Sequence, residues 1–226
     1  MATRKTRSKS SAQIKSPAPK RSQSFSKKEA IDFGFDIAKK NVIFFLSVFA
    51  ILIIGNILIN IVQHFVTQQN QLLLVFVITI FKTIFGLVTG MGLIKISLEF
   101  VDKKKPEVSD LFYTKSLVNY FLVSLINGII VVLGFILLIV PGIIFSIKLQ
   151  YATYLVVDKN MGVVEALKKS WEMTKGVKMN LFLLDLLFIG INILGVLALL
   201  VGLIITVPLT MVASAFVYRK LLARVS

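Results

Sequence analysis

Long apolar runs occupy most of the chain after residue 41, and they constrain the fold more than any other feature. A helix of about 20 apolar residues crosses the ~30 Å hydrocarbon core of a bilayer, and runs of this length are too long for ordinary core helices. We predict about six transmembrane helices, near residues 42–66, 72–98, 117–140, 142–157, 180–201 and 203–222. The sequence therefore predicts an all-α fold, a polytopic membrane helix bundle.

The fourth and sixth runs are marginal in length, and each is associated with a proline. Pro141 directly precedes the fourth run, and Pro208 lies inside the sixth. A proline in the first turn of a helix costs no hydrogen bond, because that N–H has no intrahelical partner. We interpret Pro141 as the start of a tight hairpin. Pro208 is either a second such start or a kink in a helix that already begins at Leu203.

Positive charge is segregated from the apolar runs. Apart from Lys82, Lys95 and Lys148, all of the 26 Lys and Arg residues fall in residues 1–41, 101–116, 158–180 and 219–226. The remaining connections contain none. Loops rich in Lys and Arg stay on the cytoplasmic side of a membrane. We therefore expect a multi-pass protein of the cell (inner) membrane with both termini in the cytoplasm.

Composition narrows the classes of function. Only 16% of the residues are charged and 56% are hydrophobic, whereas soluble domains carry about 25% charged residues. The chain has no Cys, which excludes disulfides, thiolate metal sites and thiol catalysis. His64 is the single histidine, so no histidine cluster serves metal binding or acid–base chemistry. No nucleophile–base–orienter set is evident. We expect no cofactor, no metal and no enzymatic activity.

The chain divides into a tail and one membrane domain. Residues 1–27 are mostly Lys, Arg, Ser, Thr, Ala, Gln and Pro, which predicts a disordered basic cytoplasmic tail. Residues 28–226 are predicted to form a single transmembrane domain. Its basic segments are expected to attract anionic lipid headgroups. Nucleic acid is not an expected partner, because no aromatic interleaving supports base stacking in the tail.

Two amphipathic helices are predicted on the cytoplasmic surface, over residues 28–41 and 158–178. In the first, Ile31, Phe35 and Ala38 recur at helical spacing and mark the apolar face. Gly176 supplies a C-terminal stop for the second. One face of the second helix is formed by Val163, Ala166, Leu167, Ser170, Trp171 and Thr174.

Polar and small residues line one face of each long run, among them Asn127 and Asn192. Such faces serve either helix packing or a polar pathway through the bundle. Three ionisable side chains also lie deep in the runs: Lys82, Lys148 and Asp185. They indicate a structural ion pair, a proton or solute site, or snorkelling to the interface. Lys82 and Asp185 have similar predicted depths in the membrane, and both lie on the polar faces of their helices. We therefore predict that these two residues form the ion pair.

Several short segments, strongest over residues 137–180, match a known pattern. They include Pro141-Gly142-Ile143, a basic residue at Lys148, Tyr154-Leu-Val-Val-Asp158 and Tyr218-Arg219. The motif positions are Pro141, Gly142, Asp158, Ser170, Trp171, Thr174, Gly176 and Pro208. With these segments the chain resembles a bacterial six-helix integral membrane family of uncharacterised role, grouped with the membrane domain of glycerophosphoryl diester phosphodiesterases.

The resemblance covers about residues 29–222 and implies a six-helix membrane module. In fused members, it implies that catalysis belongs to a separate soluble barrel rich in His, Glu and Asp. Nothing in this chain matches that barrel, so phosphodiesterase activity does not carry over. Four of the motif positions are explained equally well by a structural turn with a docked helix and by a site: Asp158, Ser170, Trp171 and Thr174.

These observations predict a non-catalytic integral membrane protein that organises lipids or a membrane-bound partner through its cytoplasmic face. The expected partners are membrane lipids with anionic headgroups and a membrane or cytoplasmic protein. The alternative is a small transporter or channel that uses Lys82, Lys148 and Asp185. An intramembrane lipid enzyme is a third class, but the runs lack paired acidic or histidine residues at matching depth.

Overall fold

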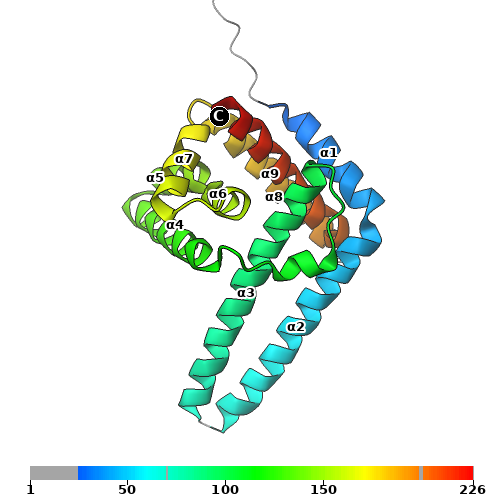
Figure 1. Ribbon diagram of the computed structural model, residues 1–226, viewed down its shortest axis with the longest axis vertical. Helices are drawn as coiled ribbons and strands as arrows, with labels where there is room; N and C mark the ends of the chain where they lie inside the picture. Colours follow the sequence, from blue (N-terminus) through cyan, green and yellow to red (C-terminus); the bar gives the residue numbers. More distant parts are fainter. Residues whose placement is uncertain (1–24, 70, 199–200, 226) are drawn as a thin grey trace, which may run out of the picture.

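The computed structural model describes residues 25–69, 71–198 and 201–225 (Figure 1). Within these ranges the chain is helical and contains no β-strand. Its elements are α1 (Lys27–Lys40), α2 (Val42–Gln68), α3 (Leu72–Val101), the short 3-10 helix η1 (Val108–Phe112), α4 (Leu117–Leu137), α5 (Ile139–Leu149), α6 (Ala152–Lys159), α7 (Val163–Met173), α8 (Lys178–Leu197) and α9 (Leu203–Val225). Six stretches are long and apolar enough to cross a membrane: α2, α3, α4, α5 with α6, α8 and α9. The predicted all-α class with six such helices is confirmed.

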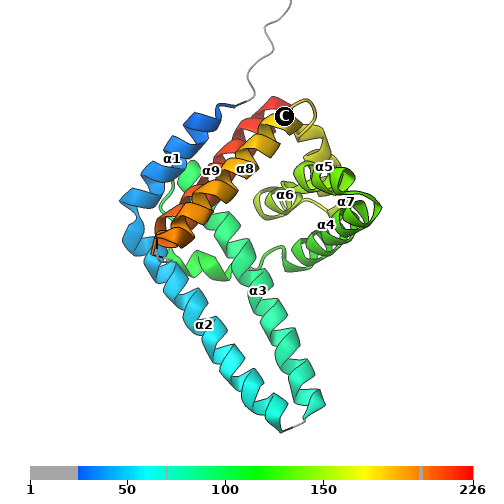
Figure 2. The ribbon, with the colours of Figure 1, turned by 180° about the vertical axis from the view of Figure 1, so that it is seen from behind.

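Helices α2 and α3 form a long hairpin that projects from the rest of the molecule (Figures 1 and 2). In the most apolar stretch of α3 only 6% of the residues are buried by the described chain, against 44% in α9. Ile43, Leu72 and Leu73 leave more than three quarters of their surface exposed. Apolar helices of this length and exposure suit contact with lipid tails.

The main hydrophobic core surrounds the second half of α9. Tyr218 and Leu221 of α9 are fully buried there, together with Leu155 of α6 and Met173 of α7. Helix α9 therefore lies at the centre of the fold, between α1 on one side and α6 and α7 on the other (Figure 1). The helices that flank the projecting hairpin are organised around this one helix.

Helix α1 packs lengthwise and antiparallel along α9. Near its start Glu29 pairs with Lys220, and one turn later Phe33 stacks on Phe216 at 5.0 Å between ring centroids. Further on, Gly34 lies against α9 so closely that a Cβ there would be 2.3 Å from the carbonyl oxygen of Leu209. The close approach of two helix backbones depends on small residues at the contact.

The buried face of α1 differs from the one that the apolar spacing predicted. The structure buries the small residues Ala30, Gly34 and Ala38, whereas Phe35 is 46% exposed. Of the predicted face, Ala38 is buried and Ile31 is half-buried. Phe35 is left exposed on the side away from these small residues, and the placement of the apolar face on the membrane surface stays a prediction.

The start of α1 extends the ordered chain into the predicted tail. Residues 1–24 of that tail lie outside the described residues. Phe25, however, is buried against the main core, and the Ser26 hydroxyl accepts a hydrogen bond from the backbone N–H of Glu29. This is an N-terminal cap of the usual kind. Phe25 and Ser26 thus pack with the helices of the described chain, and the predicted division into a tail and a membrane domain stays a prediction.

The fourth predicted membrane helix is interrupted. It consists of α5 and α6, which are separated by a turn at Gln150 and Tyr151. Pro141 lies in the first turn of α5, as predicted, and costs no hydrogen bond there. Pro208 lies inside α9, which begins at Leu203. The sixth helix therefore contains its proline and does not start at it.

Candidate functional site

The interruption between α5 and α6 is held by two hydroxyl groups of α7. Ser170 Oγ donates to the carbonyl oxygen of Lys148 at 2.8 Å, and Thr174 Oγ1 lies 3.5 Å from the same oxygen. Both hydroxyl residues are fully buried. Carbonyls in the last turn of a helix have no intrahelical donor, and a buried one without a partner is costly. The motif residues Ser170 and Thr174 thus satisfy the broken end of α5.

The side chain of Lys148 also turns towards α7. Its Nζ lies 3.0 Å from the centre of the Trp171 ring, and the Phe145 ring is 6.1 Å from that of Trp171. A cation over an indole face is stabilised by the ring quadrupole. Lys148 is 9% exposed, so its charge is held by Trp171 at the break.

We predict that removing the hydroxyl clamp destabilises the fold. Ser170→Ala is expected to lower the free energy of unfolding in detergent by about 1–3 kcal/mol, because it leaves the buried Lys148 carbonyl poorly satisfied. Ser47→Ala is the matched control, since Ser47 is exposed and bonds only within its own helix. Circular dichroism during denaturation of both variants measures the difference. Equal stability of the two variants would contradict the clamp.

Asp158 and Arg219 belong to an ionic cluster that joins three helix ends. Arg219 donates from Nη1 to Asp158 Oδ2 and from Nη2 to Asp102 Oδ2, both at 2.6 Å. The hydroxyl of Tyr218 donates to Asp158 Oδ2 at 2.9 Å. Asp102 follows α3, Asp158 lies in α6 and Arg219 lies in α9. The motif residue Asp158 therefore anchors α6 to α9, and Arg219 links both to the end of α3.

The two motif glycines lie at turns. A Cβ on Gly142 would lie 2.5 Å from the Phe135 ring, so glycine lets α5 fold back on α4. Gly176 has a φ of 83° between α7 and α8, a left-handed conformation that glycine adopts without strain. The predicted stop at Gly176 is confirmed. Both glycines therefore shape connections between helices.

The predicted Lys82–Asp185 pair is not among the ion pairs of the described residues. Lys82 Nζ donates to Asn60 Oδ1 of α2 at 2.7 Å, within the projecting hairpin. Asp185 of α8 lies beside Gln150 at the α5–α6 break. The prediction was wrong because the two residues share a depth along their helices, but the hairpin carries Lys82 away from α8 (Figure 1).

The two asparagines of the polar faces have different surroundings. Asn192 donates to Phe188 within α8 and lies 3.4 Å from the Thr210 hydroxyl of α9, which supports a packing role. Asn127 of α4 has a buried Oδ1 without a hydrogen-bond partner among the described residues, and so does the Oδ1 of Asn192. No continuous chain of polar contacts links these residues to Lys82 or Lys148 in the described structure.

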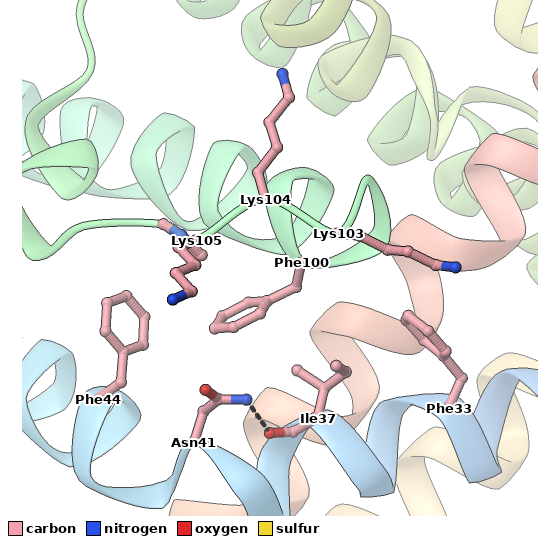
Figure 3. Close-up of a pocket in the computed structure, with 9 residues that line it drawn as sticks. Phe33, Ile37, Asn41, Phe44, Phe100, Lys103, Lys104 and Lys105 are labelled. Carbon is pink, nitrogen blue, oxygen red and sulfur yellow. Dashed lines mark hydrogen bonds between the residues drawn. The ribbon is translucent and has the colours of Figure 1, made fainter.

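A cavity that the sequence did not reveal lies where α1, α2 and α3 meet (Figure 3). It measures about 540 Å³. Its lining residues are Phe33, Ile37, Asn41, Phe44, Phe100, Lys103, Lys104, Lys105 and Pro106. Two stretches far apart in sequence build it, residues 33–44 and 100–106, so no local motif indicates it. The run of lysines at 103–105 was the one feature of the sequence that could have indicated this cavity.

The loop that carries these lysines is anchored to α3. Lys95 Nζ donates to Asp110 Oδ1 at 2.5 Å, and Glu107 and Asp110 form a capping box at the start of η1. Burial by itself raises the pKa of the Asp110 carboxyl, but the hydrogen bond and charge of Lys95 outweigh it and hold this pKa below its ordinary value. A Cβ on Gly92 would lie 2.1 Å from the Leu111 carbonyl oxygen, so glycine lets the loop approach α3.

The fold and this site define a polytopic helical protein with six helices able to span a membrane, tied together by a buried clamp and an ionic cluster. Sequence comparison then identifies its family. The chain belongs to the family described as protein of unknown function (DUF975), whose model matches residues 70–225. The match covers the hydroxyl clamp and the ionic cluster but leaves out α1 and α2.

Curated relatives are distant. An uncharacterized protein of Mycobacterium tuberculosis, Rv2560, and its Mycobacterium bovis counterpart Mb2590 are each 27% identical over 141 residues, which is 61% of this chain and 43% of the relative. The chain thus spans less than half the length of the curated relatives it matches. No solved structure matches it. The resemblance to the membrane domain of glycerophosphoryl diester phosphodiesterases is untested by these matches and stays a prediction.

Proposed function

We propose that this chain is a non-catalytic, multi-pass protein of the cell membrane that organises anionic lipids in the cytoplasmic leaflet. The observation that carries the proposal is where its exposed lysines lie. Lys39 and Lys40 precede α2, Lys159 ends α6 and Lys178 begins α8, and all four are exposed. The connections at the opposite helix ends contain no Lys or Arg. Lysines near an anionic membrane surface each contribute about 1 kcal/mol of attraction.

The proposal requires the lysine-rich ends to face the cytoplasm. Two single-cysteine variants of this cysteine-free chain test the orientation, Gln69→Cys after α2 and Lys168→Cys on α7. Both positions are exposed. An impermeant thiol reagent added outside intact cells is expected to label the first variant and spare the second. The reverse pattern, or labelling of Lys168→Cys from outside, would contradict the orientation.

Lipid selectivity tests the proposal itself. In vesicles that contain the protein, spin-labelled phosphatidylglycerol is expected to be immobilised about fivefold more than spin-labelled phosphatidylcholine, which corresponds to ~1 kcal/mol. At 1 M salt the preference is expected to fall, because the Debye length shrinks to about 3 Å. Replacing Lys39, Lys40 and Lys178 with Gln lowers the preference, whereas Gln68→Ala with Gln69→Ala leaves it unchanged. Equal immobilisation of both lipids by the unaltered protein contradicts the proposal.

A second candidate, the small transporter, is favoured by one observation. Transporters place substrate sites at interrupted helices, and Asp185 lies beside Gln150 at the interruption between α5 and α6. The other two residues of this alternative are engaged elsewhere, Lys82 by Asn60 and Lys148 by Trp171. A proton or solute flux in protein-containing vesicles that Asp185→Asn abolishes would put this function first.

A further inference from the structure

The cavity between α1, α2 and α3 combines an aromatic lining with a cationic rim. Phe33, Phe44 and Phe100 contribute apolar ring surface, and the Phe44 and Phe100 rings meet edge to face at 5.6 Å between centroids. Lys103 and Lys105 border the same space. None of the described residues that line it is acidic. The volume of about 540 Å³ lies in the range of small-molecule sites, about 300–1,000 Å³.

The three lysines of the loop do not point the same way. In Figure 3 the Lys105 ammonium group points down towards Phe44 and Asn41, and Lys103 extends towards Phe33. Lys104 points away from the cavity, on the side where it borders Glu99 and Asp102. Lys103 has a φ of 57°, which turns the chain sharply after α3. Lys104 therefore lines the cavity without its ammonium group, which lies away from the cavity and has acidic neighbours of its own.

The position of the cavity fits the headgroup level of a bilayer. Phe44 lies in the first turn of α2 and Phe100 in the last turn of α3, the same ends of two helices able to span a membrane. Beyond them the exposed apolar surface of the hairpin continues (Figure 1). A ligand here can place a charged group in water and an acyl chain on that surface. Free inorganic phosphate fits this lining poorly, because burial against three phenylalanine rings removes its water and offers no hydrogen-bond partner in return.

We propose that this cavity binds one anionic glycerophospholipid of the surrounding leaflet. The lipid phosphate lies at the cationic rim that Lys103 and Lys105 border, and an acyl chain covers the surface of Phe33, Phe44 and Phe100. Asn41 donates its side-chain N–H to the Ile37 carbonyl oxygen at 2.9 Å and so fixes the corner between α1 and α2. The inference rests on the proposed function and gives it a defined site.

Native mass spectrometry of the full chain tests the site with dioleoyl phosphatidylglycerol and dioleoyl phosphatidylcholine as probes. The unaltered protein is expected to retain one phosphatidylglycerol in preference to phosphatidylcholine. The double variant Lys103→Gln with Lys105→Gln is expected to weaken that binding about 10–30-fold, from ~1 kcal/mol per lysine. Lys104→Gln is the matched control, with the same loss of charge in the same loop, and is expected to change binding less than threefold. Circular dichroism melting checks that both variants fold. If the double variant does not fold, Lys105→Gln alone is used, with a smaller expected loss of phosphatidylglycerol binding.

Several results would overturn the site. Unchanged binding by the double variant, or an equal loss in Lys104→Gln, would show that the cavity does not hold the lipid. Displacement of phosphatidylglycerol by millimolar inorganic phosphate would identify a phosphate site instead. The spin-label selectivity distinguishes this inference from the function on which it rests. If no single bound lipid is detected and the double variant keeps the spin-label selectivity, the proposed site is wrong but the proposed function is supported. If the unaltered protein shows no spin-label selectivity, the proposed function is wrong.

Discussion

Replacing Arg219 with methionine is expected to destabilise the protein more than the loss of any exposed ion pair. The substitution leaves Asp102 without a cation and Asp158 with only the exposed Lys159 at 3.5 Å, and the Asp158 side chain is only 11% exposed. Breaking a buried ion pair from one side costs about 3–5 kcal/mol, and the partial exposure of Asp102, at 32%, places the expected loss near the lower value. Denaturation in detergent followed by circular dichroism measures it.

The neighbouring residue provides the control. Lys220 pairs with Glu29 at 3.2 Å, and both side chains are about half exposed. Lys220→Met removes the same charge from the same helix, and an exposed pair of this kind contributes at most about 1 kcal/mol. A triple variant with Arg219→Gln, Asp102→Asn and Asp158→Asn removes all three charges and is expected to recover much of the loss. If Arg219→Met and Lys220→Met behave alike, the ionic cluster does not hold the helix ends together.

Gly34→Leu is expected to separate α1 from α9. Even a Cβ at this position would lie 2.3 Å from a backbone carbonyl oxygen and 3.1 Å from the Ala213 side chain, so the helices must move apart. Overpacking of this kind costs about 1–3 kcal/mol, and more where backbone must shift. Faster tryptic cleavage between Lys27 and Lys40, together with faster amide hydrogen exchange in α1, is the expected readout.

A second glycine serves as the control for this substitution. Gly190 of α8 has open space where a Cβ would be placed, so Gly190→Leu is expected to be neutral or slightly stabilising because leucine favours helix over glycine. Protection of α1 from trypsin is expected to remain in this variant. Unchanged protection in Gly34→Leu would show that the close contact between α1 and α9 is not required.

The membrane helices were predictable because each depends on a local property, the length of an apolar run. The predicted start of the first helix at residue 42 and of the third at residue 117 agree with α2 and α4. The interruption at Gln150 and Tyr151 was not predictable, because neither residue is a helix breaker. It exists because Ser170 and Thr174, distant in sequence, satisfy the carbonyl at the break.

The site was predictable only in part, for a geometric reason. Helical periodicity gives the depth of a residue and the face on which it lies, but not which helix that face meets. Lys82 and Asp185 matched in depth and still lie on helices that diverge. The motif segments contain Asp158 and its partner Arg219, but not Asp102, the second carboxylate bound by Arg219, which comes from the end of another helix. The lysine-rimmed cavity likewise depends on the meeting of two stretches that are distant in sequence, residues 33–44 and 100–106.

Helix α3 joins two environments in one unbroken rod. Its 30 residues extend about 45 Å at 1.5 Å per residue, which exceeds a hydrocarbon core of ~30 Å. All of its buried residues, from Thr89 to Phe100, fall in the second half, which packs against η1, α6 and α9. Membrane helices tilt when bilayer thickness changes. No loop separates the two halves of α3. A tilt of its exposed first half is therefore expected to turn the second half, which carries Lys95 and is followed by Asp102.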